Sequence, residues 1–122
     1  MEKKVRAIRG AIQVEIDRPE TVLDATAKLL TAIVQANGVE VDDVISAMFT
    51  TTPDLNSCFP AEAARGLGFA ETPLICAQEI NVPGAPPRII RILLWAYSPI
   101  QKTHIRHVYL DGAESLRKDI AQ

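Results

Sequence analysis

An arginine inside an apolar stretch is the residue best placed to do chemistry in this chain. Residues 89–95 read IIRILLW, an apolar run typical of a buried strand, and Arg91 carries the charge within it. On a pleated strand, Arg91 shares a face with Ile89, Leu93 and Trp95. A guanidinium keeps its charge, and an unpaired charge in a dry place costs several kcal/mol. Arg91 therefore needs an anion, either from the protein itself or from a ligand.

Further polar groups lie in segments with strand or helix patterns: Arg9, Arg65, Glu79, Arg106, Tyr109 and Arg117. One interpretation pairs Arg91 with Glu79, across a turn, in a structural ion pair. In the other, Arg9 and Arg91 converge on a small dianion, since arginine binds carboxylates bidentately, and Glu79 orients a hydroxyl group. The pattern of residues leaves both interpretations open.

Other kinds of chemistry find little support in the residue types and their spacing. A nucleophilic site would use Cys58 or Cys76 with His104 or His107, and no motif joins them. On a strand, the spacing of the two histidines places them on opposite faces, and no cysteine or carboxylate cluster completes a metal site. Residues 66–69, GLGF, are interpreted as a helix stop and not as a phosphate loop. We therefore expect no metal and no cofactor.

The composition predicts one globular domain, residues 1–122. Apolar residues make up 48% of the chain, which is enough for a core. The net charge of −2 does not suggest nucleic-acid binding, and no apolar stretch is long enough to span a membrane. The stretch MEKKVRAIRG lacks the apolar run of a signal peptide. Two cysteines are too few for a disulfide scaffold, so we expect reduced thiols in a cytoplasmic protein.

An α+β fold is predicted to position these side chains. The clearest helix spans residues 17–37, with Asp17 and Glu20 as a capping box and Asn37 and Gly38 as its stop. Its apolar stripe consists of Val22, Thr26, Leu29, Leu30, Ile33 and Val34. A five-stranded mixed sheet and short helical turns complete the fold. The strands are predicted at residues 5–16, 45–51, 74–82, 89–95 and 105–110, and the turns at residues 41–44, 60–67 and 111–119.

The predicted sheet needs more cover than one helix provides. A sheet has two faces, and one long helix covers only one of them. Because residues 89–95 are apolar on both faces, the second face must meet something, most simply another copy of the chain. We therefore expect a homo-oligomer. In residues 5–16, Gly10 marks a place where the strand bends or where another segment approaches the backbone closely.

Several motifs, taken in order along nearly the whole chain, are similar to those of one enzyme family. They are RAIRGA (6–11), TPDLNSCFPAEAAR (52–65), PLICAQE (73–79), RIIRIL (88–93), IRHVYL (105–110) and LR (116–117). Each motif is modest alone, but their order and spacing together are specific. The chain resembles the small, trimeric, mixed α/β class of monofunctional chorismate mutases, which is unrelated to the all-helical class.

The resemblance implies an isomerase of the shikimate pathway and aromatic amino acid biosynthesis. Such an enzyme converts chorismate to prephenate by a pericyclic (Claisen) rearrangement that needs no metal or cofactor. The resemblance also implies a homotrimer with a pseudo-α/β barrel and an active site at each subunit interface. An alternative is a non-catalytic trimer that binds small carboxylates with the same interface arginines. A third interpretation is a structural oligomer with a buried pair of Arg91 and Glu79.

The matched motifs imply roles for individual residues. Arg91 would contact the ether oxygen of the breaking bond, Arg9 would bind a substrate carboxylate, and Tyr109 would lie near the carboxylate and ether end. Glu79 and Cys76 would hydrogen-bond the ring hydroxyl. The residues that would line or close the pocket from the neighbouring subunit are Phe59, Ala61, Arg65, Leu116 and Arg117.

Two positions depart from the family pattern. Glu62 stands where a relative carries lysine near the pocket mouth, which weakens the electrostatic steering of a dianion. Lys118 stands where relatives often have proline, which leaves the tail less rigid.

Overall fold

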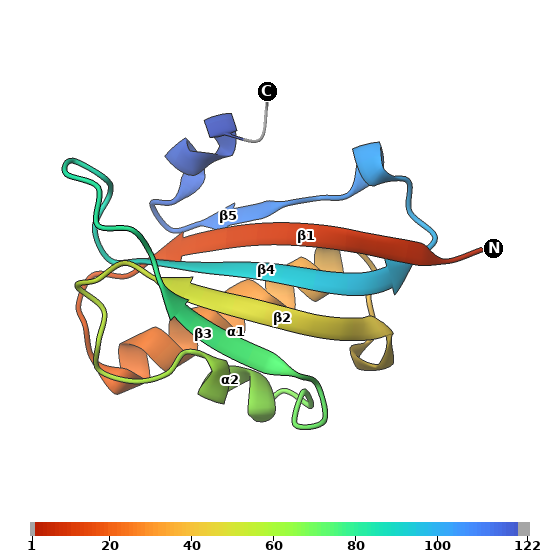
Figure 1. The fold of residues 1–122 in the computed structure, drawn as a ribbon, viewed down its shortest axis with the longest axis horizontal. Coiled ribbons are helices and arrows are strands. Elements are labelled where there is room, and N and C mark those ends of the chain that lie inside the picture. The colour runs from red at the N-terminus through yellow and green to blue at the C-terminus, as the bar shows by residue number, and fades with distance from the viewer. Residues whose placement is uncertain (1, 120–122) are drawn as a thin grey trace.

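The computed structural model describes the backbone of residues 2–119 and the side chains of residues 2–116. The predicted five-stranded mixed sheet is confirmed, with the strand order β3-β2-β4-β1-β5 (Figure 1). Its strands are β1 (Lys4–Gln13), β2 (Val44–Thr51), β3 (Leu74–Gln78), β4 (Ile89–Ser98) and β5 (Val108–Leu110). The central strand β4 pairs antiparallel with β1 and β2, and the edge strands β5 and β3 pair parallel with β1 and β2 respectively.

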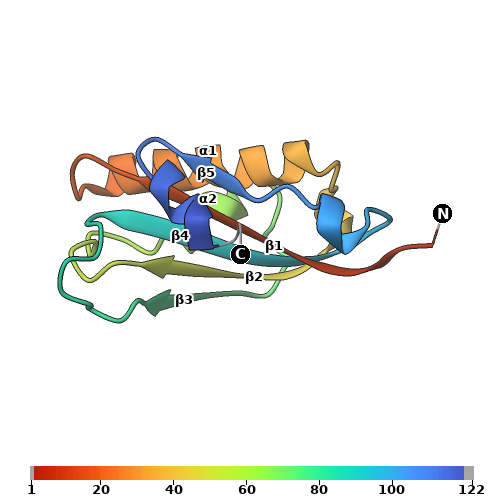
Figure 2. The ribbon, with the colours of Figure 1, turned by 90° about the horizontal axis from the view of Figure 1, so that it is seen from above.

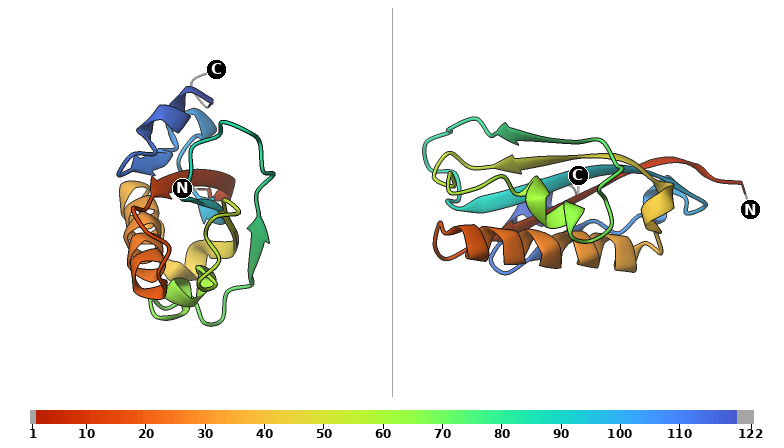
Figure 3. Two further views of the ribbon diagram at one scale, coloured as in Figure 1. Left: turned by 90° about the vertical axis from the view of Figure 1, so that its left-hand side faces the viewer. Right: turned by 90° about the horizontal axis from the view of Figure 1, so that it is seen from below.

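The two α-helices lie on one side of the sheet. The long helix α1 (Pro19–Ala36) runs along it and the short helix α2 (Ala61–Arg65) lies on the same side (Figures 2 and 3). Short 3₁₀ helices are η1 (Val41–Asp43), η2 (Lys102–His104) and η3 (Glu114–Asp119). None of the helices in residues 2–119 combines the length and the apolar character needed to cross a bilayer.

The main core lies between α1 and the sheet, as the apolar stripe of the helix predicts. Five of the six stripe residues, all except the half-buried Val34, are fully buried. They pack against the side chains that β1, β2 and β4 turn toward the helix: Ile8, Ile12, Phe49, Ile90, Ile92 and Leu94. This burial fixes which face of each strand is turned away from the helix, because side chains alternate along a strand.

Gly10 lies where the backbone of β1 meets the helix. A Cβ atom at this position would lie 2.8 Å from Cδ1 of Ile33, 3.0 Å from Cδ1 of Leu29 and 2.9 Å from the carbonyl oxygen of Val108. The close approach expected from the sequence is therefore confirmed. A side chain here would push α1 and β5 away from β1.

The start of α1 differs from the prediction. The helix begins at Pro19, and the residue before it, Arg18, makes no side-chain cap. Asp17 does not cap the helix. Instead, its carboxylate accepts hydrogen bonds from the backbone N–H groups of Asn56 and Ser57, at 3.0 and 3.3 Å. Hydrogen bonds between residues far apart in the sequence thus take the place of the predicted local capping box.

Several other element boundaries were also wrong. Helix α2 begins after Pro60, and strand β1 ends at Gln13 instead of at residue 16. Strand β3 ends at Gln78. Strand β5 begins only at Val108, because the side chains of Asn37 and His107 accept hydrogen bonds from the backbone N–H groups of Arg106 and Arg9 along the first part of the predicted strand. Strand β4 continues beyond the prediction to Ser98.

The face of the sheet turned away from the helices is largely open. Leu93 and Trp95 of β4 are half-buried there, and Ile75 of β3 is 59% exposed. At one end, Ala11 and Ile89 form a small second cluster with Ala113, Tyr109 and Leu116. The rest of this apolar face has no cover from residues 2–116.

Candidate active site

Arg91 lies at the centre of a row of residues that crosses all five strands. On β4 it pairs with Ala11 of β1 and with Thr50 of β2. Tyr109 of β5 stands opposite Ala11, and Ala77 of β3 stands opposite Thr50. Cross-strand partners share a face, so all five side chains point away from the helices. The small Ala11 leaves room between the arginine and the tyrosine.

Arg9 joins this row from the neighbouring pleat of β1. It is exposed, stands opposite Leu93, and shares the face of Ala11. The two arginines and Tyr109 line one pocket of about 160 Å³, together with Gly10, Met48, Thr50, Ile92 and Leu93. Arg9 and Arg91 thus lie beside one another in one chain, as one of the two interpretations left open by the sequence requires.

Glu79 follows the end of β3 and pairs with Arg91. The Nε atom of Arg91 lies 3.2 Å from Oε1 and 3.1 Å from Oε2 of Glu79, and the hydroxyl of Thr50 donates to Oε2 at 2.6 Å. The Arg91 side chain is 38% exposed and that of Glu79 is 19% exposed. Because both contacts use Nε, the terminal amino groups of Arg91 have no hydrogen-bond partner among residues 2–116 and are available to another anion.

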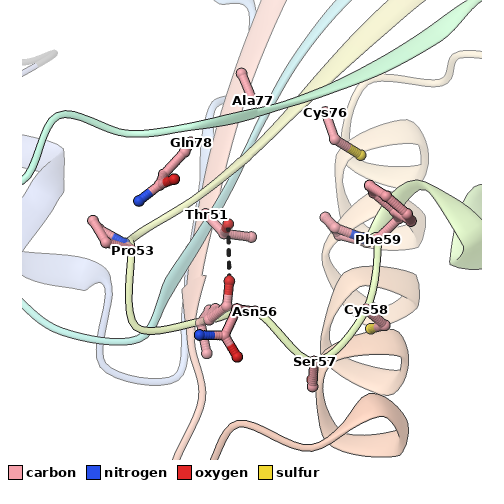
Figure 4. A pocket seen from close by; sticks show the side chains of 11 residues that line it. Thr51, Pro53, Asn56, Ser57, Cys58, Phe59, Cys76, Ala77 and Gln78 are labelled. Atoms are coloured by element: carbon pink, nitrogen blue, oxygen red, sulfur yellow. Dashed lines mark hydrogen bonds between the residues drawn. The ribbon is translucent and has the colours of Figure 1, made fainter.

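Cys76 lies on the opposite face of the sheet from Glu79. It stands opposite the buried Phe49 of β2, and both point toward the helix side. There Cys76, Cys58 and Phe59 line a second pocket of about 390 Å³ (Figure 4). Burial raises the pKa of the Cys58 thiol above its usual value, which disfavours the thiolate that nucleophilic chemistry would need.

The loop before α2 presents Phe59 to the outside, where its side chain is 70% exposed. Asp17 anchors this loop through the backbone of Asn56 and Ser57. These hydrogen bonds, first of all that from Asn56, hold the pKa of Asp17 below its usual range.

The remaining predicted site residues are not gathered in one place. Arg65 is exposed at the end of α2, whereas Ala61 is only 4% exposed and belongs to the main core. Leu116 packs near Tyr109 of the same chain. Arg117 lies in η3, and its side chain is outside the described part of the structure.

Two neighbours of the arginines were missing from the predicted site. Thr50 contacts Glu79, and alternation along β2 would have placed it on the face of Met48. His107 accepts a hydrogen bond from the backbone N–H of Arg9 through Nδ1, at 3.0 Å. The sequence had placed His107 on the same face as Tyr109, but the contact with Arg9 depends on how β1 and β5 come together.

Comparison with known proteins shows the family to which the chain belongs. Residues 5–120 match the family described as chorismate mutase type I. The chain belongs to the type I chorismate mutases. It is 46% identical over 117 residues to chorismate mutase AroH of Thermus thermophilus, covering 95% of this chain and 96% of the relative. It is 38% identical over 118 residues to chorismate mutase AroH of Bacillus subtilis (strain 168), covering 96% and 93%.

The fold agrees with that of a solved chorismate mutase from Clostridium thermocellum. The TM-score is 0.88 and the sequence identity is 43%, over 89% of this chain and 97% of that structure. The activity is therefore that of a chorismate mutase, an isomerase of aromatic amino acid biosynthesis. Among the side chains of residues 2–116, no group of three or more His, Cys, Asp or Glu residues is placed to hold a metal ion.

Proposed function

We propose that this chorismate mutase rearranges chorismate to prephenate between two copies of the chain, with Arg91 as the principal catalytic residue. The observation that carries the proposal is the Arg91 side chain, whose terminal amino groups are available beside Arg9 on an open sheet face. In the chain without a ligand, Glu79 contacts the guanidinium of Arg91 only through Nε.

The chemistry requires shape and charge. In a pericyclic rearrangement of one substrate, bonds break and form together, so no nucleophile is needed. The enzyme must hold the reactive, compact conformer, which is a gain of proximity and orientation. It must also place positive charge where the ether oxygen becomes negative in the transition state. A fixed guanidinium provides that charge without reorganising.

The positions of the other residues support the roles that the family resemblance implies. Arg9 lines the same pocket as Arg91 and binds a carboxylate of the substrate. Tyr109 stands across Ala11 from Arg91, so its phenol is near the carboxylate and ether end. Glu79 is held by Thr50 and accepts a hydrogen bond from the ring hydroxyl.

The second half of the site comes from a neighbouring copy in a trimer. The pocket beside Arg91, at about 160 Å³, is smaller than the roughly 300–1,000 Å³ typical of ligand pockets. The exposed apolar face around this pocket is typical of a surface that binds another protein chain. The Phe59 pocket lies on the other side of the same chain. In a closed ring, the Phe59 pocket of one copy completes the Arg91 pocket of the next. We also expect the enzyme to act in the cytoplasm, as the reduced cysteines suggest.

The test is an ultraviolet assay of chorismate depletion with purified protein and no added cofactor. We expect Arg91→Ala to lower kcat by roughly a hundred- to a thousandfold or more, because it removes a charged donor from the transition state. The matched control is Arg106→Ala, which removes an exposed arginine outside both pockets. Full activity of Arg91→Ala in an intact oligomer would remove Arg91 from the proposed mechanism. Binding of a dicarboxylate without any turnover would favour the carboxylate-binding alternative.

A further inference from the structure

The backbone of Arg9 is held on one side by a side chain instead of a strand. Its N–H group donates to Nδ1 of His107, with an N–N distance of 3.0 Å. The pairing of β1 with β5 begins one residue later, where Gly10 stands opposite Val108. The imidazole therefore supplies the acceptor that a longer β5 would have supplied from its backbone.

This hydrogen bond lies where β1 changes from pairing on both sides to pairing on one. On its other side, strand β1 stays paired with β4 throughout this region, and Arg9 stands opposite Leu93. Backbone that is hydrogen-bonded on one side only opens more easily than backbone held on both. The direction of the exposed Arg9 side chain depends on this backbone, and that side chain lines the Arg91 pocket.

We propose that His107 is a positioning residue for Arg9, whose imidazole fixes the backbone from which the substrate-binding guanidinium extends. The inference rests on the proposed role of Arg9 in binding a substrate carboxylate. It assigns no contact with substrate to His107 itself.

The hydrogen bond requires neutral histidine. Nδ1 can accept only while it carries no proton, so the proton of the neutral ring is on Nε2. Burial first, and then the positive charge of Arg9, lower the pKa of His107 below its ordinary value of 6.5. The bond is therefore present at neutral pH.

Other charged or titratable groups lie on the elements that pack around this edge. On α1, Lys28 pairs with Asp111 at 2.7 Å, and the carboxylate of Glu114 accepts from the backbone of Gly112. The described charged or titratable groups on and around these elements are Lys4, Arg6, Arg9, Glu20, Asp24, Lys28, Lys102, His104, Arg106, Tyr109, Asp111 and Glu114. Among these described groups, only Arg9 contributes to the lowered pKa of His107.

The sign of the pH effect follows from the lowered pKa. Below pH 6.5, the unfolded chain binds a proton at this histidine before the folded chain does. The stabilising contribution of neutral His107 is complete above that pH and is lost as the pH falls through the folded pKa. Protonation in the folded enzyme also removes the acceptor for the Arg9 N–H group. KM for chorismate should therefore rise as the pH falls through the folded pKa of His107, which lies below 6.5.

The experiment compares variants of His107 with a matched variant of the other histidine. His107→Asn keeps an acceptor near the position of Nδ1 and does not titrate, whereas His107→Ala removes the acceptor. His104→Asn is the control, because His104 is exposed in η2 and makes no side-chain hydrogen bond among residues 2–116. Steady-state kinetics between about pH 5 and pH 8 give kcat and KM separately for the intact oligomer.

We expect His107→Ala to raise KM by roughly three- to tenfold at pH 7 with little change in kcat, since one backbone hydrogen bond is lost. His107→Asn should restore KM and abolish its rise at acid pH, and His104→Asn should behave as wild type. A second readout is the scalar coupling between the Arg9 amide nitrogen and Nδ1 of His107 in nuclear magnetic resonance spectra. We expect it in the wild type and not below the folded pKa.

Three outcomes separate this inference from the proposed function. An unchanged KM in His107→Ala, in a protein whose Arg9→Ala variant loses affinity for chorismate, would overturn the role of His107. An unchanged KM in Arg9→Ala would instead overturn the proposed role of Arg9. Absence of the scalar coupling in the wild type at pH 7 would contradict the hydrogen bond itself.

Discussion

At the scale of single residues, the pair of Arg91 and Glu79 combines two interpretations that the sequence left open. The ion pair exists in the chain without a ligand, at 3.1 Å. It uses only Nε of the guanidinium, so the carboxylate can orient Arg91 while the terminal amino groups bind another anion. A protein carboxylate and a ligand can therefore share this arginine.

The double-mutant cycle of Arg91→Ala and Glu79→Ala tests whether this pair is mainly structural. Because both side chains keep contact with solvent, we expect a coupling free energy in urea unfolding of about 1 kcal/mol or less. In each single variant, the loss of activity, expressed as a free energy, should be much larger than the loss in the free energy of unfolding. A coupling of roughly 3–5 kcal/mol without ligand, typical of a buried pair, would support the structural interpretation.

At the scale of elements, the loop before α2 depends on a residue from the start of α1. The carboxylate of Asp17 accepts from two consecutive backbone N–H groups, those of Asn56 and Ser57. Both bonds favour the charged form, which is why the pKa of Asp17 is lowered. The exposed ring of Phe59 lies on the chain just after this anchor.

Asp17→Ala should lower the free energy of unfolding by roughly 1–3 kcal/mol and raise KM, because the loop carrying Phe59 loses its anchor. The exposed Asp24→Ala on α1 is the control. The contribution of Asp17 is present above its ordinary pKa of 3.8 and is lost as the pH falls through the lower, folded pKa. Urea unfolding of both variants at pH 7 and pH 3 measures this contribution of Asp17 to the free energy of unfolding. Equal loss of stability in the two variants would argue against the anchor.

The sequence predicted the elements that depend on periodicity and missed those that depend on distant contacts. The stripe on α1, the central strand around Arg91 and the close approach at Gly10 follow from local patterns, and the structure confirms them. The role of Asp17 could not be read locally, because its partners are far along the chain. The late start of β5 depends on the hydrogen bond between His107 and Arg9.

The positions of Cys76 and Glu79 in the candidate site also show what a local pattern predicts and what it does not. Alternation along β3 places Cys76 and Glu79 on opposite faces, and the sheet register agrees. The family resemblance had grouped both with the same substrate hydroxyl.

At the scale of the whole molecule, the two pockets lie on different faces of one sheet. The Arg91 pocket is on the open face, and the Phe59 pocket is on the helix side. They cannot meet around one ligand within a single copy. Each chain in the proposed ring thus contributes to two different sites.

Because the two pockets are separate, two inactive variants can restore activity when they assemble together. Arg91→Ala damages one pocket, and Phe59→Asp puts a negative charge in the other at an exposed position. In any trimer that contains both variants, one site combines an undamaged Arg91 pocket with an undamaged Phe59 pocket. Unfolding and refolding the two together in equal amounts should recover about a quarter of wild-type activity.

The matched control is a mixture of Arg91→Ala with Arg9→Ala, which damages the same pocket twice and should recover nothing. Recovery from neither mixture would place the whole site within one copy, and recovery from both would mean that Arg9 and Arg91 of one copy serve different sites. If the prediction holds, a cell that carries two defective copies of this gene could still make its own aromatic amino acids. Whether two mutations are harmful together would then depend on which face of the sheet each one affects.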